Sequence, residues 1–535
     1  MLMTKRKRTV GPDGDSPMCD LEKSPNDKLS YRLLEFDNGF EALLISTSDP
    51  QKNKAAASMA VGAGSFSDPQ GRCEGLAHYL EHMLFMGSKR YPGEDEMEEF
   101  LSKHGGYSNA YTEAGHTCYY FEINKTELHK ALDMFAGFFV APLMKEDSAS
   151  REIQAIDSEF RLTQNSDGSR VEQLLASFAT QGHPFRTFGW GSLASLSEAT
   201  KKAGVDLNKE LRDFYDTHYR APRLRLCVYG VESLDSLEKA VRASFVGLPV
   251  MAKGEADAGP QEAALAAAGP PFAASALPLL LRVRPVKDVH KLCLAWQLPP
   301  VQHLYKTKPE QYVQHLVGHE GAGSLLSFLK KQGLATQLTA GVSGDSFESN
   351  SMCAMFGIDI LLTRTGLEKW PDVAHAAMLY LEMLRRTGPQ EWVFQEIKAV
   401  QDMDWRFLQE SNPTDQVQSL ACQMLPVYKV EREHILKAPY LMVDWDHKTV
   451  MTLLEHMRPE NAMMHLLSSA YGRAKGAPTE DKGEGEGEDE GDEGDEGEDD
   501  GDDGDGEDED GEGEEGEEEE EEGEGDEEEG DDQGG

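Results

Sequence analysis

The 535-residue sequence lacks several features that would place it in familiar classes of protein. It has no uninterrupted apolar run of about 18 residues or more, so we expect no membrane span. Its seven cysteines are scattered, odd in number and without a Cys-x-x-Cys pair, which is typical of reduced thiols in the cytoplasm and not of a disulfide framework. Lys and Arg are in no broad excess, which argues against a nucleic-acid-binding surface.

The N-terminus lacks the apolar segment of a signal peptide and the long Arg/Ser-rich stretch of a transit peptide. Its basic cluster Lys5–Arg8 is most simply a solvated tail, and a nuclear-import signal is the alternative. The sequence therefore predicts a cytoplasmic protein, with the nucleus as the alternative compartment.

The net charge of −45 is concentrated at one end of the chain. Residues 480–535 hold 37 of the 97 acidic residues and one lysine, so the other 479 residues carry a net charge of only −9. From residue 475 onward almost nothing apolar is present, and such a segment cannot bury a core. We expect residues 475–535 to be a disordered acidic tail that either keeps the chain soluble or recruits basic peptides or cations.

Composition and periodicity divide the rest of the chain into two similar units. Residues 1–27 are expected to be disordered, and residues 251–277 have the Ala/Gly/Pro composition of a linker. The units on either side, 28–250 and 278–474, share an order of strands, helices, strands and long helices. The predicted fold class is α+β, with two α/β-roll units in which a mainly antiparallel sheet is packed by helices.

The pattern places these elements with the following bounds. Strands are expected at Tyr31–Phe36, Glu41–Ser46, Ala55–Ala63, Tyr107–Thr112, Thr117–Ile123, Leu224–Tyr229, Leu292–Leu298, Met355–Leu362 and Ala462–Ser468. Helices are expected at 75–86, 95–104, 126–140, 146–163, 233–244, 309–318, 323–332, 368–387, 389–411 and 446–457.

The strongest chemical signal lies in the helix expected at 75–86. His78 and His82 are one turn apart and face the same way, so their two imidazoles can clamp a Zn²⁺ ion. Glu81 lies beside them and is placed to take a proton from water, as in the H-x-x-E-H arrangement of zinc peptidases. A helix that carries two histidines by chance is the alternative, which the intervening glutamate and the apolar flanks disfavour.

A catalytic zinc ion needs a third protein ligand. The helix expected at 146–163 offers Glu152 and Glu159, which are seven residues apart and share a face, whereas Asp157 points elsewhere. From residue types alone, a solvated helix face is an equally good interpretation of these glutamates.

Several longer runs resemble the insulinase (pitrilysin) family of zinc peptidases, and especially its nardilysin-like members. The resemblance covers about residues 27–472. The matching runs are GSFSD at 64–68, GLAHYLEHMLFMGS at 75–88, SKHGGYSNAYTE at 102–113, FFVAPLM at 138–144, REIQAIDSEF at 151–160, GHPF at 182–185, GHEGAGSLLSFL at 318–329 and MRPEN at 457–461.

This resemblance implies roles for particular residues. It makes Glu159 the third ligand of one Zn²⁺ per chain, and Glu152 a carboxylate that steadies the site from behind. It also implies that substrate binds as an added β-strand along Ser108, Asn109, Ala110 and Tyr111. The expected activity is that of a zinc endopeptidase in which Glu81 is the general base, with basic or dibasic cleavage sites as a hypothesis.

The chain also departs from the large members of this family. They have four such units, and their second half supplies an Arg and a Tyr near the substrate, whereas this sequence runs into the acidic tail after the second unit. Their acidic insert lies ahead of the zinc motif, where this chain has only Ser46–Lys54. The alternatives are therefore a half-length chain that needs a second-half subunit or a homodimer, a binder of basic peptides through its tail, a half-size processing peptidase, or an incomplete sequence.

A second pair of histidines, His315 and His319, has the same spacing as the first. The position equivalent to Glu81 is Gly318, so a general base is missing. Glycines at 318, 321 and 323 favour the end of a helix there. We therefore predict a helix end and a loop at this point, and no second metal site.

Overall fold

The computed structural model describes residues 21–250 and 265–471. The acidic tail, the first part of the proposed linker and most of the proposed N-terminal extension lie outside the described residues. The described residues all belong to one compact body. Within the described residues, no helix combines the length and the apolar character needed to cross a membrane.

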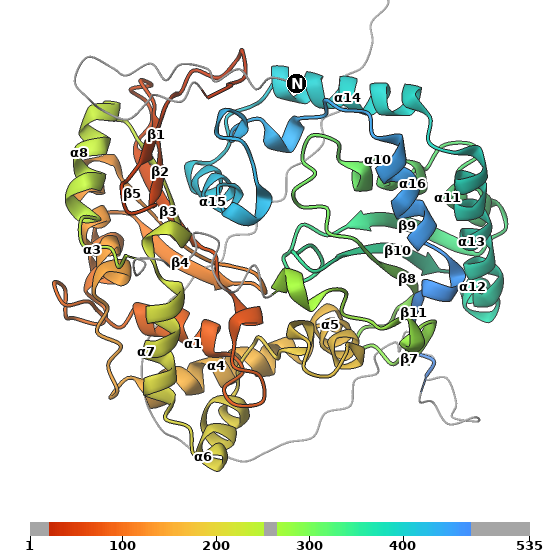
Figure 1. Cartoon of the computed structure of the whole chain (residues 1–535), viewed down its shortest axis with the longest axis horizontal. Helices are drawn as coiled ribbons and strands as arrows, with labels where there is room; N and C mark the ends of the chain where they lie inside the picture. Colours follow the sequence, from red (N-terminus) through yellow and green to blue (C-terminus); the bar gives the residue numbers. More distant parts are fainter. Residues whose placement is uncertain (1–20, 251–264, 472–535) are drawn as a thin grey trace, which may run out of the picture. The chain divides into compact units, whose positions relative to one another are not determined.

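The first sheet has six strands in the order β1-β2-β6-β3-β5-β4 (Figure 1). All neighbouring strands are antiparallel except β2 and β6, which are parallel. β4 lies at the edge of the sheet and pairs with β5 in a register that sets Tyr111 opposite Cys118. The strands are β1 (Ser30–Glu35), β2 (Glu41–Ser46), β3 (Lys54–Val61), β4 (Tyr107–Thr112), β5 (Thr117–Asn124) and β6 (Leu224–Gly230).

Helices of the same part of the chain cover one face of this sheet. Alternate residues of β3 and β5 point toward them, and together they form a buried core that includes Met59 and Phe121. The helices in this core are α1 (Leu76–Leu84), α2 (Glu96–Lys103), α3 (Leu128–Val140), α4 (Ala149–Thr163), α7 (Leu207–His218) and α8 (Leu234–Ser244). The helices α5 (Asp167–Phe178) and α6 (Thr200–Ala203) of the same part of the chain contribute no residue to it.

The second sheet repeats the topology of the first. Its order is β7-β11-β8-β10-β9, with β7 and β11 parallel and the other pairs antiparallel. This is the pattern of β2-β6-β3-β5-β4, so the structure bears out the predicted α+β fold of two similar units. The strands are β7 (Leu279–Val283), β8 (His290–Leu298), β9 (Ala335–Val342), β10 (Ala354–Leu362) and β11 (Met463–Ser468).

The helices that pack on the second sheet form a separate core around the fully buried Trp296. By its place in this repeated topology, α10 corresponds to α1 of the first unit. It ends at Val317, and His319 lies beyond it in a loop where its Nδ1 accepts a hydrogen bond from the Gly321 amide. The helices are α10 (Pro309–Val317), α11 (Leu325–Lys331), α12 (Arg364–Glu368), α13 (Trp370–Thr387), α14 (Glu391–Arg406) and α16 (His447–His456).

A helix from late in the chain covers the other face of the first sheet. α15 (Pro413–Gln423) packs on β3, β5 and β6, and its residues Val417 and Leu420 join a core with strand residues of the first unit (Figure 1). The hydroxyl of Thr414 also donates a hydrogen bond to Glu122 of β5 (2.9 Å). The first sheet is therefore buried between its own helices and a segment almost 300 residues further along the chain.

Most expected elements are present within a few residues of their predicted bounds. The main omissions are α5, α7, α15, β7 and β9, and the helix expected at 389–411 ends at Arg406. Residues 265–277, in the second part of the proposed linker, contact the second sheet. Phe272 is buried there and exchanges two hydrogen bonds with the side chain of Gln297 in β8.

Candidate active site

Helix α1 begins where the chain makes a close approach to a distant loop. Gly75 has a φ of 89°, and a Cβ atom there would lie 2.1 Å from the Cα of Gly191. Only glycine permits this contact. The contact brings the carbonyl of Trp190 to the histidine in the first turn of α1.

The buried carboxylate of Asp68 holds the same end of α1. It accepts hydrogen bonds from the amides of Gly75, Leu76 and Ala77 at 2.7, 3.1 and 2.9 Å. These donors have no partner within the helix, and the helix dipole favours a negative charge at this end. Asp68 therefore fixes the start of the helix that carries both histidines.

Replacing Asp68 by Ala should leave these three buried amides without an acceptor. A buried unsatisfied group costs about 1–3 kcal/mol, so we expect the free energy of unfolding to fall by about 3 kcal/mol or more. Urea denaturation measures the effect. Asp68→Asn is the matched control, because it keeps an acceptor oxygen and should lose less stability. An unchanged midpoint for Asp68→Ala would contradict this role.

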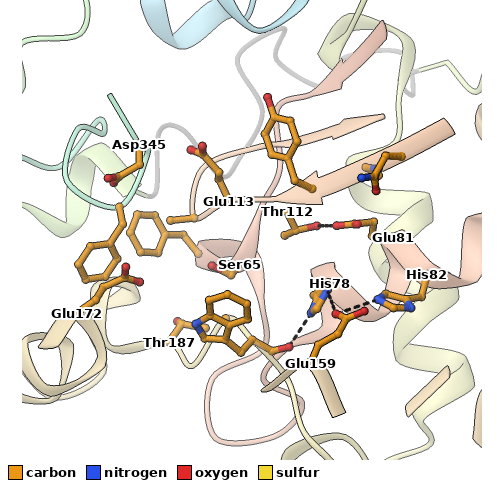
Figure 2. Close-up of a pocket in the computed structure, with 18 of the residues that line it drawn as sticks. Ser65, His78, Glu81, His82, Thr112, Glu113, Glu159, Glu172, Thr187 and Asp345 are labelled. Atoms are coloured by element: carbon orange, nitrogen blue, oxygen red, sulfur yellow. Dashed lines mark hydrogen bonds and ion pairs between the residues drawn. The ribbon is translucent and has the colours of Figure 1, made fainter. Parts of the chain in front are cut away.

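His78 and His82 turn their Nε2 atoms toward one carboxylate on α4 (Figure 2). Oε2 of Glu159 lies 3.3 Å from Nε2 of His78 and 3.6 Å from Nε2 of His82. Ligands bound tetrahedrally at about 2.0–2.1 Å from a zinc ion are about 3.3–3.4 Å apart. Two imidazoles and a carboxylate at this spacing fit Zn²⁺ in chemistry and in distance.

Hydrogen bonds on the far side of each ring hold it in this orientation. Nδ1 of His78 donates to the Trp190 carbonyl at 2.7 Å, and Nδ1 of His82 faces Oε2 of Glu152 at 3.4 Å. A proton held on Nδ1 leaves the lone pair of Nε2 free for a metal. Glu152 is itself buried and paired with the side chain of Arg151.

Glu81 lies on the same helix and points to the strand β4. It is buried, and its Oε2 accepts a hydrogen bond from the hydroxyl of Thr112 at 2.6 Å (Figure 2). Burial raises the pKa of Glu81, an effect that the nearby His78 and this hydrogen bond oppose. A carboxylate with a raised pKa, fixed in position and facing a cavity, suits a general base.

Contacts within the cluster also shift the pKa values of Glu159 and His78. The pKa of Glu159 is held well below its usual range by the hydrogen bonds from His78 and His82. Burial would lower the pKa of His78, but its hydrogen bond to Glu159 and the charge of Glu81 outweigh that effect and raise it. A carboxylate anion therefore lies directly between the two imidazoles.

A cavity of about 640 Å³ opens over these residues. Three of the four residues expected to bind substrate, Asn109, Ala110 and Tyr111, line it, whereas Ser108 instead donates a hydrogen bond to Glu98. β4 has no partner strand on its outer side among the described residues, so its backbone can accept an added strand there.

The far end of the cavity is acidic, a feature that the sequence analysis missed. Glu113, Glu172 and Asp345 line it, the last from the second unit, and no Lys or Arg is among the described residues around the cavity (Figure 2). Burial, followed by the charges of Asp345, Glu348 and Glu113, raises the pKa of Glu172 to about 7. We call Glu113, Glu172 and Asp345 the acidic wall.

Some of the site residues that were not predicted carry a signal in the sequence, and others do not. Thr112 continues the expected substrate strand, and strand alternation places it on the same face as Ala110, so a signal existed. Trp190, Glu172 and Asp345 belong to no motif, and only the folded chain brings them to the site.

A second cluster of metal-type ligands, Glu431, Glu433 and His434, lies on the surface. Its carboxylates are exposed, and Glu431 is paired with Lys306 at 2.6 Å. An exposed cluster whose carboxylate already has a cationic partner is a poor candidate for a metal centre.

Comparison with known proteins agrees with this arrangement. The chain belongs to the insulinase family, peptidase family M16. Residues 43–187 match the model of that family, residues 207–401 match its inactive peptidase domain, and residues 405–483 match its middle or third domain. The last match includes α15, which covers the second face of the first sheet, and β11, which completes the second sheet.

Individual relatives bear the names nardilysin and insulin-degrading enzyme. The chain is 39% identical over 508 residues to a nardilysin-like protein of Arabidopsis thaliana, covering 84% of this chain and 48% of the relative. It is 37% identical to rat nardilysin, covering 83% and 37%, and 37% identical to human insulin-degrading enzyme, covering 84% and 42%. The chain thus spans about half the length of these relatives, or less.

Solved structures share the fold. A crystal structure of pitrilysin superposes with a TM-score of 0.76 at 30% identity, over 84% of this chain and 46% of that one. A protease from Helicobacter pylori superposes with a TM-score of 0.61 at 17% identity, and all of that chain is covered. The second likeness concerns the fold alone.

Proposed function

We propose that this chain is a zinc-dependent endopeptidase that hydrolyses peptides at basic residues. The observation that carries the proposal is the convergence of His78, His82 and Glu159 beside the buried carboxylate of Glu81, at the floor of a cavity bounded by an edge strand. Membership of a peptidase family and the names of the relatives support it.

His78, His82 and Glu159 would hold the metal, and Glu152 would orient His82. When bound, Zn²⁺ polarises a carbonyl oxygen and lowers the pKa of water. The chain's own residues supply the rest. The substrate backbone pairs with β4, Thr112 keeps Glu81 in place, and Glu81 takes the proton of the attacking water and passes it to the leaving amine.

The acidic wall supports the preference for basic residues. Its three carboxylates line the same cavity as Glu81, and the described lining offers no Lys or Arg to neutralise them. A lysine or arginine side chain of the substrate would supply the missing positive charges. The acidic tail is a second source of attraction for basic peptides. A variant truncated after residue 474 keeps the acidic wall but lacks the tail, so it separates the two effects.

The double substitution Glu172→Gln and Asp345→Asn should lower the preference for basic peptides about tenfold. A charge pair at about 4 Å is worth about 4 kcal/mol at the surface, and salt and remaining carboxylates reduce this. The measurement is the ratio of kcat/KM for two peptides that differ only by Lys or norleucine. Glu396→Gln, an exposed position on α14, is the matched control.

The pH should change the same ratio of kcat/KM for the Lys and norleucine peptides. Since the pKa of Glu172 is about 7, this group is neutral at pH 6 and charged at pH 8. The preference for Lys over norleucine should therefore rise as the pH rises through about 7, more in the native chain than in the double variant. If the ratio of kcat/KM for the Lys and norleucine peptides is unchanged by the substitutions, by salt and by deletion of the tail, the proposal of basic cleavage sites is wrong.

The three ligands of one chain would hold zinc without a partner, and a partner would complete the cavity. Because no Lys or Arg lines the described cavity, a second-half subunit or a second copy that contributes a cationic group would stabilise the developing negative charge. We keep this subunit, and a peptide-binding role without independent activity, as the second candidate. Native mass measurement distinguishes monomer from pair. We propose the cytoplasm as the compartment, because the cysteines that the structure describes are free.

A further inference from the structure

Two cysteines from distant parts of the chain meet on the face of the first sheet that α15 covers. Cys118 lies on β5, directly opposite Tyr111 of the edge strand, and Cys422 lies in the last turn of α15. Cys118 is fully buried, whereas Cys422 is partly exposed. Neither residue belongs to the zinc cluster or to the acidic wall.

Hydrogen bonds connect the two sulfur atoms with each other and with their neighbours. The side chains of Cys118 and Cys422 are hydrogen-bonded to each other, and the sulfur of Cys118 also lies 3.2 Å from the hydroxyl of Ser58. The hydroxyl of Tyr111 lies 3.6 Å from the sulfur of Cys422. The two thiols therefore share one polar pocket in the interface between α15 and the first sheet.

This environment distinguishes the two sulfurs chemically. Burial opposes ionisation of Cys118, but the hydrogen bonds from Cys422, Ser58 and Tyr111 outweigh it and lower its pKa. The hydrogen bond to Cys118 and burial raise the pKa of Cys422. Cys118 is thus the better nucleophile of the pair, and Cys422 is the one that solvent reaches.

The other described cysteines have different surroundings. Cys293 is partly exposed like Cys422, but its thiol is hydrogen-bonded to the carboxylate of Asp359. Cys353 is buried against the side chain of Asn350. These residues provide controls within the same chain.

We propose that Cys118 and Cys422 form a redox modification site, at which hydroperoxides convert the two thiols into a disulfide that links β5 to α15. The inference stands on this contact alone and does not depend on peptidase activity. Such a bond would fasten the late segment of the chain to the sheet that carries the edge strand β4.

The reaction balances with peroxide as the oxidant. The sulfur of Cys422 attacks one peroxide oxygen, the O–O bond breaks, and the thiol proton leaves in a molecule of water, which gives a sulfenic acid. The sulfur of Cys118 then attacks the sulfur of Cys422, the S–O bond breaks, and hydroxide leaves as water with the proton of Cys118. Two thiols and one hydrogen peroxide give one disulfide and two waters.

The experiment treats the full chain with hydrogen peroxide, blocks free thiols by alkylation, and maps peptides by mass spectrometry. We expect a peptide pair joined through Cys118 and Cys422, lighter by two hydrogen atoms and separated again by dithiothreitol. We also expect a higher melting temperature, because a link between distant positions restricts the unfolded chain. Cys118→Ser and Cys422→Ser should each abolish the link, whereas Cys293→Ser should keep it.

Two results on the native chain would overturn the proposal, whether or not the variants fold. In the first, both thiols remain open to alkylation after peroxide treatment. In the second, Cys422 is oxidised to sulfinic acid, or joined to another chain, without any link to Cys118.

Discussion

Glu81→Gln should reduce peptide cleavage by at least about 100-fold while leaving the zinc content unchanged. A positioned general base contributes about 10²- to 10⁴-fold to a rate, and glutamine keeps the shape but cannot accept the proton. Glu81 is not among the three groups that converge on the metal position, so the ligands stay in place. Steady-state cleavage of a quenched fluorescent peptide, with zinc measured in the same samples, gives both quantities.

The control for this variant is Glu198→Gln, which removes a carboxylate from an exposed position. It should cleave like the native chain. Retention of more than about a tenth of the activity by Glu81→Gln would be incompatible with a general base of the strength expected here.

Glu159→Ala should weaken zinc binding by more than about 100-fold. Loss of a residue that only orients a ligand already lowers metal affinity about 10- to 100-fold. Within the described part of the chain, Glu159 is the one carboxylate that faces both Nε2 atoms. Glu152→Gln should fall within the smaller range, because it touches only the far side of His82. Equilibrium dialysis against a competing chelator measures the affinities.

The same helix provides a matched control for the ligand variant. Asp157 lies between these glutamates in sequence, but its carboxylate binds the Leu193 amide and Arg161. Asp157→Asn should keep native zinc affinity. If Glu159→Ala retained zinc as tightly as Asp157→Asn does, the third ligand would have to be another group.

The sequence was most informative where local pattern and chemistry coincide. The amphipathic period and the H-x-x-E-H spacing placed α1, and the shared face of Glu152 and Glu159 was visible from their seven-residue separation. Geometry alone left the choice between those glutamates open. The structure separates them, since Glu159 faces the two Nε2 atoms and Glu152 faces Nδ1 of His82.

Elements that depend on distant partners were missed. The sequence of α15 is polar and buries only Thr414, Val417, Leu420 and Ala421, so its periodicity is weak. Its stability comes from a sheet almost 300 residues earlier, which no local pattern reports. The acidic wall escaped notice for the same reason, because Glu172 and Asp345 meet only through the packing of two units.

The repeated topology explains the histidine pair that resembles the zinc motif. α10 occupies the place of α1 in the second sheet, but it ends at Val317, before His319. Gly318 stands where Glu81 stands in the first unit. The second unit thus keeps the architecture of the site without its base or a continuous ligand helix.

We propose that one zinc ion on His78, His82 and Glu159 makes this chain a peptidase. The most direct test removes metal from the native chain with a chelator, returns zinc in measured steps, and follows peptide cleavage and bound zinc together. Cleavage should disappear on chelation and return in proportion to zinc, up to about one ion per chain. Cleavage that persists in a chain free of metal would contradict it, and so would a chain that fills with zinc, alone or paired, and cleaves nothing.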